Sequence, residues 1–234
     1  MFCVTNRRDD NEDWFTGAHY QHGQPFRTLA GDHIVGQLLS RRVEALVGNP
    51  PKARALEVGP GEAPLLERTA IGGKYYLERS YAVARKLRGS TPGAAVLLGD
   101  IREIPVSRKP HFDVAVAAEV FTHVLPERRL DALKSIADRT KALLVIDRPT
   151  MSDHAIGEEL RFHMMMLALE RGSQNVAREI LFKEIPADTM ERERLERVDF
   201  EPLAQRLRER GFSVEIEPIM HRHFTYHVMT ARRR

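Results

Sequence analysis

The sequence of 234 residues predicts an α/β fold. We expect a doubly wound sheet of seven strands, mostly parallel with an antiparallel last strand, and a helical insertion after the fifth strand. Short apolar strands alternate with helices from residue 53 to residue 147, which is typical of parallel strands joined by crossover helices. The alternation then stops. Helical patterns fill about 150–198, and the chain ends in two strands that read as a hairpin.

Periodicity and breaker residues place the elements in chain order. Residues 1–13 are polar, and we expect them to be loosely held. A helix is predicted within 29–46, where apolar residues recur at helical spacing, and it ends at Gly48–Pro51 because proline cannot continue a helix. The further predictions are strands at 55–58, up to Glu78, at 94–100, in the segment 112–123 and at 142–147, helices at 158–171, within 174–198 and at 200–210, and strands at 212–218 and 223–231.

Composition argues against several classes of protein. Apolar residues make up 42% of the chain, enough for a core, yet no apolar run approaches the ~20 residues of a membrane span. The first residues lack the apolar stretch of a signal peptide. A single cysteine, Cys3, excludes an internal disulfide framework and a cysteine-built metal site. We therefore expect a cytoplasmic protein with no membrane partner.

A glycine turn after the first strand is the most informative feature. The segment 55–63 reads as a buried strand that stops at Gly59 and Gly61 and then enters a helix. Glycine lets the backbone turn tightly and lets a ligand lie against it. The start of the helix would offer N–H groups to a carboxylate or phosphate. Glu78, at the tip of the next strand, is placed to bind two ribose hydroxyls. These features predict a site for an adenosine-containing cofactor.

The next two strands add further motifs. The third ends in Asp100 and is followed by Ile101, and the fourth carries Glu119 and His123 in the pattern Asp-x-x-x-x-x-Glu-Val-x-x-His-Val. In these motifs the chain resembles the class I S-adenosylmethionine-dependent methyltransferases, over about residues 50–150 and the C-terminal hairpin. The resemblance implies a Rossmann-like fold with one reversed strand. Ala63 stands where the family loop has a third glycine and is nearly as small.

The resemblance also implies how the chain would hold S-adenosylmethionine and its product S-adenosylhomocysteine. In the family the glycine loop holds the methionyl part, the carboxylate after the second strand holds the ribose, and the aspartate after the third holds the adenine amine. Ligands of open α/β sheets bind at the carboxyl ends of the strands, so one crevice is expected, with Asp147 at its border. The residues expected at the cofactor are Glu57, Gly59, Pro60, Gly61, Glu78, Arg79, Asp100, Ile101 and Glu119.

Candidates for catalysis are few, because methyl transfer depends mainly on alignment and the cofactor supplies the electrophile. His123 follows the fourth strand and could accept a proton near neutral pH, or it could cap the short helix there. Glu119 lies on the same turn and could hold substrate or solvate the loop.

The segment 221–227 is rich in histidine. On one strand His221, His223 and His227 would share a face, which leaves open a metal site, a half-exposed face or a wall of the substrate pocket. Metal-dependent relatives use a carboxylate-rich set, and the chain offers no obvious Asp-Asp-Asn pattern. We therefore expect no metal and keep His223 as a substrate candidate.

The insertion at about 150–198 is expected to cap the acceptor. Met165 lies in a methionine stripe that suits an adaptable pocket, and His154 flanks it. The same stripe could pack as core or seal a homodimer. We expect residues 1–50 to cover the cofactor from the other side, with Tyr20 near the substrate, and residues 51–234 to form the methyltransferase domain.

Three functions remain open from the sequence. The first is a methyltransferase acting on an oxygen or nitrogen of a small-molecule acceptor, because the insertion would enclose such an acceptor and exclude water. The second is an RNA or protein methyltransferase: net charge is +3 and the pI about 9.1, although basic residues are interleaved with acids, so nucleic acid is not favoured. The third is a non-catalytic subunit that binds S-adenosylmethionine. A nicotinamide-dependent dehydrogenase is disfavoured, because it would give the third and fourth motifs no role.

Overall fold

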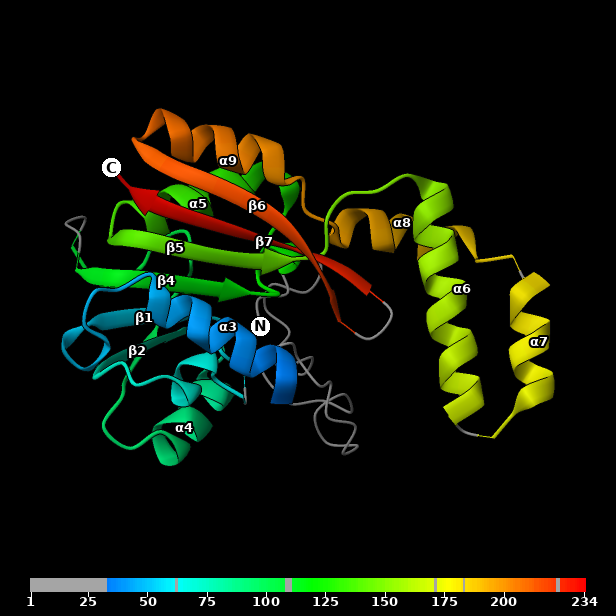
Figure 1. The fold of residues 1–234 in the computed structure, drawn as a ribbon, viewed down its shortest axis with the longest axis horizontal. Helices are drawn as coiled ribbons and strands as arrows, with labels where there is room; N and C mark the ends of the chain where they lie inside the picture. The colour runs from blue at the N-terminus through cyan, green and yellow to red at the C-terminus, as the bar shows by residue number, and fades with distance from the viewer. Residues whose placement is uncertain (1–32, 62, 108–110, 171, 183, 222–223) are drawn as a thin grey trace.

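The computed structural model describes residues 33–234, apart from 62, 108–110, 171, 183 and 222–223 (Figure 1). It confirms a seven-stranded sheet, with the order β3-β2-β1-β4-β5-β7-β6. The strands are β1 (Arg54–Val58), β2 (Gly73–Glu78), β3 (Ala95–Leu98), β4 (Phe112–Ala118), β5 (Thr140–Asp147), β6 (Phe212–His221) and β7 (Phe224–Arg233). Strands β1 to β5 pair in parallel, whereas β7 is antiparallel to both β5 and β6. The predicted reversed last strand is therefore confirmed.

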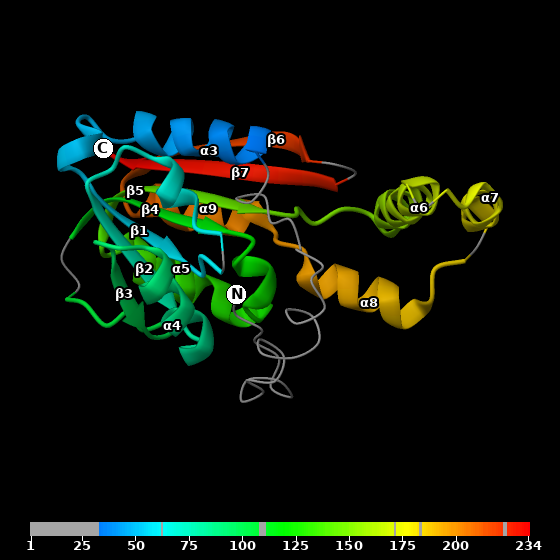
Figure 2. The same cartoon turned by 90° about the horizontal axis from the view of Figure 1, so that it is seen from below.

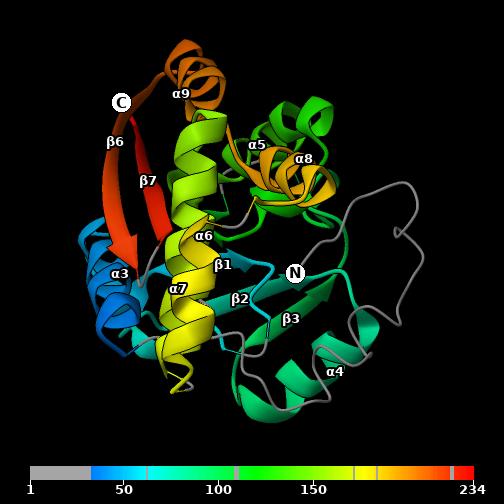
Figure 3. The same ribbon diagram turned by 90° about the vertical axis from the view of Figure 1, so that its right-hand side faces the viewer.

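Helices cover both faces of this sheet. On one face lie α3 (His33–Ala45) and α4 (Tyr81–Ser90), and on the other lie α5 (Arg129–Ala137) and α9 (Phe200–Glu209) (Figures 1 and 3). Alternate residues of the central strands supply the two cores: Val114 packs toward α3, and Ala115 toward α5 and α9. This doubly wound arrangement follows from strands that are apolar on both faces, as in β4 and β5. No described helix has the length and apolar character needed to cross a bilayer.

The predicted insertion after β5 consists of α6 (Asp153–Glu170), α7 (Gln174–Phe182) and α8 (Ala187–Glu196). Helices α6 and α7 lie side by side and project from the carboxyl end of the sheet (Figures 1 and 2). We call these three helices the cap. Two arginines fix its base: Arg148 pairs with Glu193 at 2.7 Å, and the fully buried Arg197 pairs with Glu159. Charged groups therefore form the junction between cap and sheet.

The prediction of an α-helix directly after the glycine turn is wrong. A four-residue 3₁₀ helix, η2 (Leu65–Arg68), stands there instead. Pro64 precedes it in an extended conformation, and Thr69, also extended, ends it. The described residues between the turn and β2 therefore form no α-helix whose N-terminus could face a ligand, and the dipole argument for this segment does not apply.

Candidate functional site

Four carboxylates expected around the crevice lie at the carboxyl ends of the parallel strands, the edge that Figure 3 faces. Glu78 ends β2, and Asp147 ends β5. Glu119 follows the last residue of β4, and Asp100 comes two residues after β3. Since parallel strands present their carboxyl ends at one edge, the structure brings these four carboxylates to the same side of the sheet.

The glycine turn has the backbone that glycine permits. Gly59 and Gly61 both have φ of 59°, in the left-handed region. The N–H of Gly59 donates to the carbonyl of Leu77 at 2.9 Å, which ties the turn to β2. The buried Pro60 stands between the two glycines. Among the described residues other than its chain neighbours, none has a heavy atom within 4 Å of the point where a Cβ on Gly61 would stand, so the described structure leaves this side of the turn open.

Glu57 is turned inward. Its side chain is buried and accepts the N–H groups of Leu65 at 2.8 Å and Leu66 at 2.9 Å. Burial raises the pKa of Glu57 to about 7, and these two hydrogen bonds oppose the rise. The amides expected to face a ligand are therefore bound by Glu57. A cofactor role for Glu57 stays a prediction. In the structure its carboxylate binds the backbone that follows the glycine turn.

Glu78 is buried at the tip of β2. Its Oε1 accepts the N–H of Ser80 at 2.9 Å, and the hydroxyl of Ser80 accepts the N–H of Val83 at 3.4 Å as the N-cap of α4. The half-buried Arg79 lies between them. This capped turn fixes the carboxylate at the place where the ribose is expected.

Asp100 is already engaged by a residue that sequence reasoning missed. Its Oδ1 accepts the backbone N–H of Arg102 at 2.8 Å and Nε at 2.9 Å, and its Oδ2 accepts from Nη2 at 2.7 Å. Partial burial acts to raise the pKa of Asp100, but the bonds from Arg102 hold that pKa below its ordinary value. The neighbouring Ile101 is buried. An adenine amine would therefore share Asp100 with Arg102.

The β4–β5 side of the edge carries an acidic cluster with a phenol. Glu119 has φ of 56°, and its Oε1 accepts the hydroxyl of Tyr226 at 3.1 Å. Asp147 is 1% exposed and accepts the N–H of Phe121 at 2.8 Å. Burial raises the pKa of Asp147 to about 7, and repulsion from Glu119 adds to the rise. Tyr226 was missed in the sequence as a site residue, although a tyrosine on the strand beside β5 is a usable signal.

His123 ends the 3₁₀ helix η3 (Phe121–His123), as its predicted place after β4 requires. Burial lowers the pKa of its ring to about 3. The imidazole is therefore neutral at physiological pH and a much weaker base than the sequence analysis assumed. Its catalytic role stays a prediction.

The structure divides the substrate candidates. His154 is exposed in the first turn of α6, and Met165 is half-buried on the same helix. Tyr20 and His223 lie outside the described residues. Their substrate roles remain predictions.

The expectation that three histidines share one strand face is wrong. His221 ends β6 and pairs with Phe224, whereas His227 lies on β7. The ring of His221 contacts Tyr226, and the ring of His227 contacts Phe200 on the α9 face. The chain reverses between the two strands, so a period of two cannot be carried across residues 222–223. Among the described residues, no three His, Cys, Asp or Glu side chains are grouped to hold a metal ion.

Arg129 connects the segment after β4 to the end of the cap. Its guanidinium donates to the carbonyls of Phe121 and Val124 at 3.0 Å, of Arg197 at 2.7 Å and of Leu195 at 2.8 Å. One buried cation thus satisfies carbonyls from two segments that are far apart in sequence. Nothing in the local sequence singles out this arginine.

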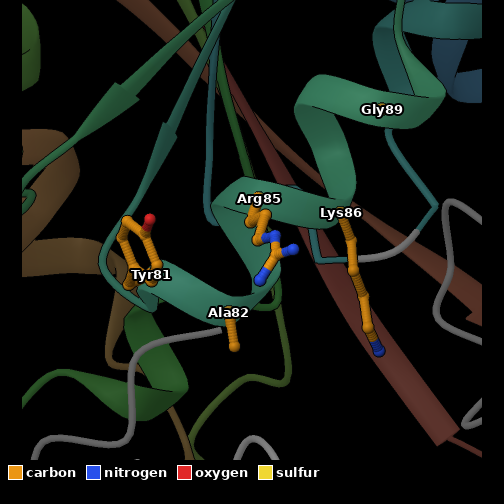
Figure 4. Close-up of a pocket in the computed structure, with 5 residues that line it drawn as sticks. All are labelled: Tyr81, Ala82, Arg85, Lys86 and Gly89. Atoms are coloured by element: carbon orange, nitrogen blue, oxygen red, sulfur yellow. The ribbon is translucent and has the colours of Figure 1, made fainter.

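A separate hollow of about 480 Å³ lies on α4 (Figure 4). It is lined by Tyr81, Ala82, Arg85, Lys86 and Gly89. It begins next to Ser80 and lies along the helix, not between the strand ends. A second hollow of about 450 Å³ includes Asp113 and Lys141, near the amino ends of β4 and β5.

Comparison with known proteins places the fold. No protein-family model matches the sequence, and no curated protein matches it. Among solved structures, magnesium protoporphyrin IX methyltransferase from Synechocystis PCC 6803 with bound S-adenosylmethionine aligns at a TM-score of 0.62, with 15% identity over 100% of both chains. Its complex with S-adenosylhomocysteine gives 0.60 and 16%, over 95% of this chain and 98% of that one. A TehB-like methyltransferase from Corynebacterium glutamicum gives 0.53 and 14%, over 88% and 91%. The chain therefore has the fold of the class I S-adenosylmethionine-dependent methyltransferases.

Proposed function

We propose that this protein is an S-adenosylmethionine-dependent methyltransferase acting on an oxygen or nitrogen of a small-molecule acceptor. One observation carries the proposal: the left-handed turn at Gly59 and Gly61 lies at the same sheet edge as Glu78 and Asp100, which follow the next two strands. A methionyl group, a ribose and an adenine joined in one molecule need binding groups in that order.

The residues present fit such a cofactor. The open side of Gly61 leaves room for a ligand against the backbone, Glu78 supplies a carboxylate at the tip of β2 for ribose hydroxyls, and Ile101 offers an apolar side chain for a purine. The bound cofactor would supply the methyl group as an electrophile. The chain's task is then to align the acceptor and to keep water away.

The cap supports a small acceptor. Helices α6 to α8 stand beyond the strand ends, next to β5 and β7, and Met165 belongs to this insertion. The Synechocystis neighbour acts on magnesium protoporphyrin IX, a small molecule. A cytoplasmic location agrees with this function but rests on the sequence alone.

The hollow on α4 favours a second candidate, an RNA methyltransferase. Tyr81 is 57% exposed beside Arg85 and Lys86, and an aromatic ring next to cations suits stacked bases and phosphates. Binding of mixed tRNA and rRNA, measured across a salt series, tests this candidate. Tight binding at physiological salt with a steep salt dependence would favour RNA, and its absence would remove the candidate.

The cofactor can be tested before the acceptor is known. We would titrate S-adenosylhomocysteine into wild type and into Glu78→Gln by calorimetry. We expect micromolar binding by wild type and a loss of about ten-fold or more in the variant, or ~1.4 kcal/mol, because an amide cannot accept two ribose hydroxyls as a carboxylate does. Glu103→Gln is the matched control, since Glu103 is exposed just beyond Asp100.

Two further measurements define the result. NADH should not bind, and the thermal midpoint of each variant should show that it is folded. Folded wild type that does not bind S-adenosylhomocysteine would reject the proposal. Binding without methyl transfer to any acceptor in a metabolite pool, measured with labelled S-adenosylmethionine, would favour the non-catalytic subunit.

A further inference from the structure

We propose that the carboxylate of Glu119 distinguishes the two forms of the cofactor by charge: it favours the sulfonium of S-adenosylmethionine over the neutral thioether of the product, while Tyr226 positions it. This inference rests on the proposed function and adds a specific task to one residue of the site. It concerns the relative affinity for two ligands that differ by one methyl group and one positive charge.

The location of Glu119 is the first argument. The residue directly follows β4, which lies between β1, the strand leading into the glycine turn, and β5. A cofactor whose methionyl part lies on that turn would bring its sulfur toward the end of β4. Glu119 is half-buried, so its carboxylate is near the surface of the crevice without being fully hydrated.

The backbone of Glu119 is the second argument. It is the one described non-glycine residue with positive φ, at 56°, where glycine or asparagine would cost less. Its N–H donates to the carbonyl of Ile146 at 2.7 Å, which holds this conformation against β5. Strain of this kind persists where the surrounding structure enforces it and is common at functional sites. Here it directs a carboxylate away from the path of β4.

Hydrogen bonding fixes the side chain. The hydroxyl of Tyr226 reaches Glu119 from β7, and it donates at 3.1 Å from a side chain that is 6% exposed. A buried phenol has one proton to give, so it orients one carboxylate oxygen and leaves the negative charge in place. Tyr226 therefore acts as a positioning residue.

Several charged groups lie near Glu119 and Tyr226. Asp147 and Glu119 repel each other, and the nearby described cations are Arg129 on α5 and Arg148, which follows β5. Arg129 donates all its described hydrogen bonds to backbone carbonyls. Arg148 pairs with Glu193 and Glu196 of the cap. The described hydrogen bonds of both cations therefore go to groups other than Glu119. A ligand cation beside Glu119 would be attracted by its carboxylate.

A preference of Glu119 for the positively charged sulfonium has a direct consequence for turnover. When the acceptor's lone pair forms the new bond to the methyl carbon, the S–CH₃ bond breaks and the sulfur keeps the electron pair. The positive charge passes from the sulfur to the acceptor, which loses a proton to solvent if its attacking atom carries one, and the attraction between the sulfur and Glu119 is lost. The same carboxylate that holds the substrate form of the cofactor therefore weakens retention of the product.

The test needs no acceptor. Calorimetry would give dissociation constants for S-adenosylmethionine and S-adenosylhomocysteine with wild type and Glu119→Gln at pH 8. We expect the variant to bind S-adenosylmethionine about ten-fold more weakly and S-adenosylhomocysteine less than about two-fold more weakly, since one unit charge is removed near the sulfonium alone. Glu215→Gln makes the same charge change on the exposed edge strand β6 and should leave both constants unchanged.

Tyr226→Phe separates charge from structure. It removes the hydroxyl and keeps the carboxylate, so the ratio of the two constants should stay within about three-fold of wild type. An equal loss for both ligands in Glu119→Gln, or a ratio unchanged from wild type, would overturn the inference while leaving the proposed function intact. Failure of wild type to bind S-adenosylhomocysteine would instead reject the function itself.

pH gives an independent readout. Burial and Glu119 raise the pKa of Asp147 to about 7, so its charge is added to the cluster as pH rises from 6 to 8. The preference of wild type for S-adenosylmethionine should increase over this range, and S-adenosylmethionine should release more protons on binding at pH 7 than S-adenosylhomocysteine does. Equal proton release for the two ligands would contradict the inference.

Discussion

The two halves of the strand edge are held together in different ways. At β1 to β3 the carboxylates bind close neighbours in the chain: Glu57 reaches amides eight and nine residues on, and Glu78 reaches one two residues on. At β4, β5 and β7 the contacts are distant: Glu119 and Tyr226 are 107 residues apart, and Arg148 and Glu193 are 45 apart. The first half can form as soon as its strands do, whereas the second exists only in the complete fold.

The largest effect is expected from removing the buried ion pair that joins the cap to the sheet. Arg197 is fully buried and pairs with Glu159, whose other oxygen accepts the N–H of Thr225 at 2.6 Å. Arg197→Met would leave Glu159 buried without its cation, so we expect a loss of ~3–5 kcal/mol in the free energy of unfolding, or local detachment of the cap. Urea unfolding and limited proteolysis across residues 150–198 distinguish the two outcomes.

The double variant Arg197→Met/Glu159→Gln is the control. It removes both charges, so it should recover much of the stability lost in the single variant. If the cap and the first half are independent, S-adenosylhomocysteine binding should survive in any variant that stays folded. Equal stability of Arg197→Met and wild type would contradict the assigned role of this ion pair.

A smaller effect probes Asp147 through pH. The folded protein keeps this carboxyl protonated up to a pKa of about 7, whereas the unfolded chain releases the proton near 3.8. The raised pKa means that the free energy of unfolding falls as pH rises through this window, by roughly 2–4 kcal/mol. Asp147→Asn should flatten that decline, because its amide oxygen can still accept the N–H of Phe121.

Some decline should persist in Asp147→Asn, because burial also raises the pKa of Glu57 to about 7. Asp131→Asn is the control, since Asp131 is exposed on α5 and should not flatten the decline. Denaturation midpoints from pH 4 to 8 give the measurement. A wild-type stability that rises steadily over this range would show that Asp147 is ionised in the folded protein.

The contrast between the halves explains what the sequence could predict. Alternating apolar segments and the glycine turn correctly predicted strands β1 to β5, with Glu78 at the end of β2 and Asp100 two residues after β3, because these depend on short-range patterns. The helix after Gly61 was mispredicted, since Glu57 takes the amides and Pro64 favours an extended entry. The link that Arg129 makes to the cap has no local pattern, because its acceptors there, the carbonyls of Leu195 and Arg197, are more than sixty residues away.

The smallest expected effect tests the local half at the glycine turn. Gly61 has φ of 59°, and a Cβ there would meet no atom within 4 Å. Gly61→Ala should therefore cost only the strain of a left-handed alanine, ~1 kcal/mol in the free energy of unfolding by urea denaturation. Gly48→Ala is the matched control: it also has open space, and φ is not positive there, so we expect no loss.

Ligand binding makes the same pair of variants informative about the site. If the cofactor lies against the backbone at Gly61, a methyl group on the open side of the turn would collide with it. S-adenosylhomocysteine affinity should then fall in Gly61→Ala, because the backbone strain is present with and without ligand and would not by itself weaken binding; affinity should not change in Gly48→Ala. Unchanged affinity in Gly61→Ala would show that the ligand does not contact this turn. Its site would then have to lie nearer Glu119, at the ends of β4, β5 and β7.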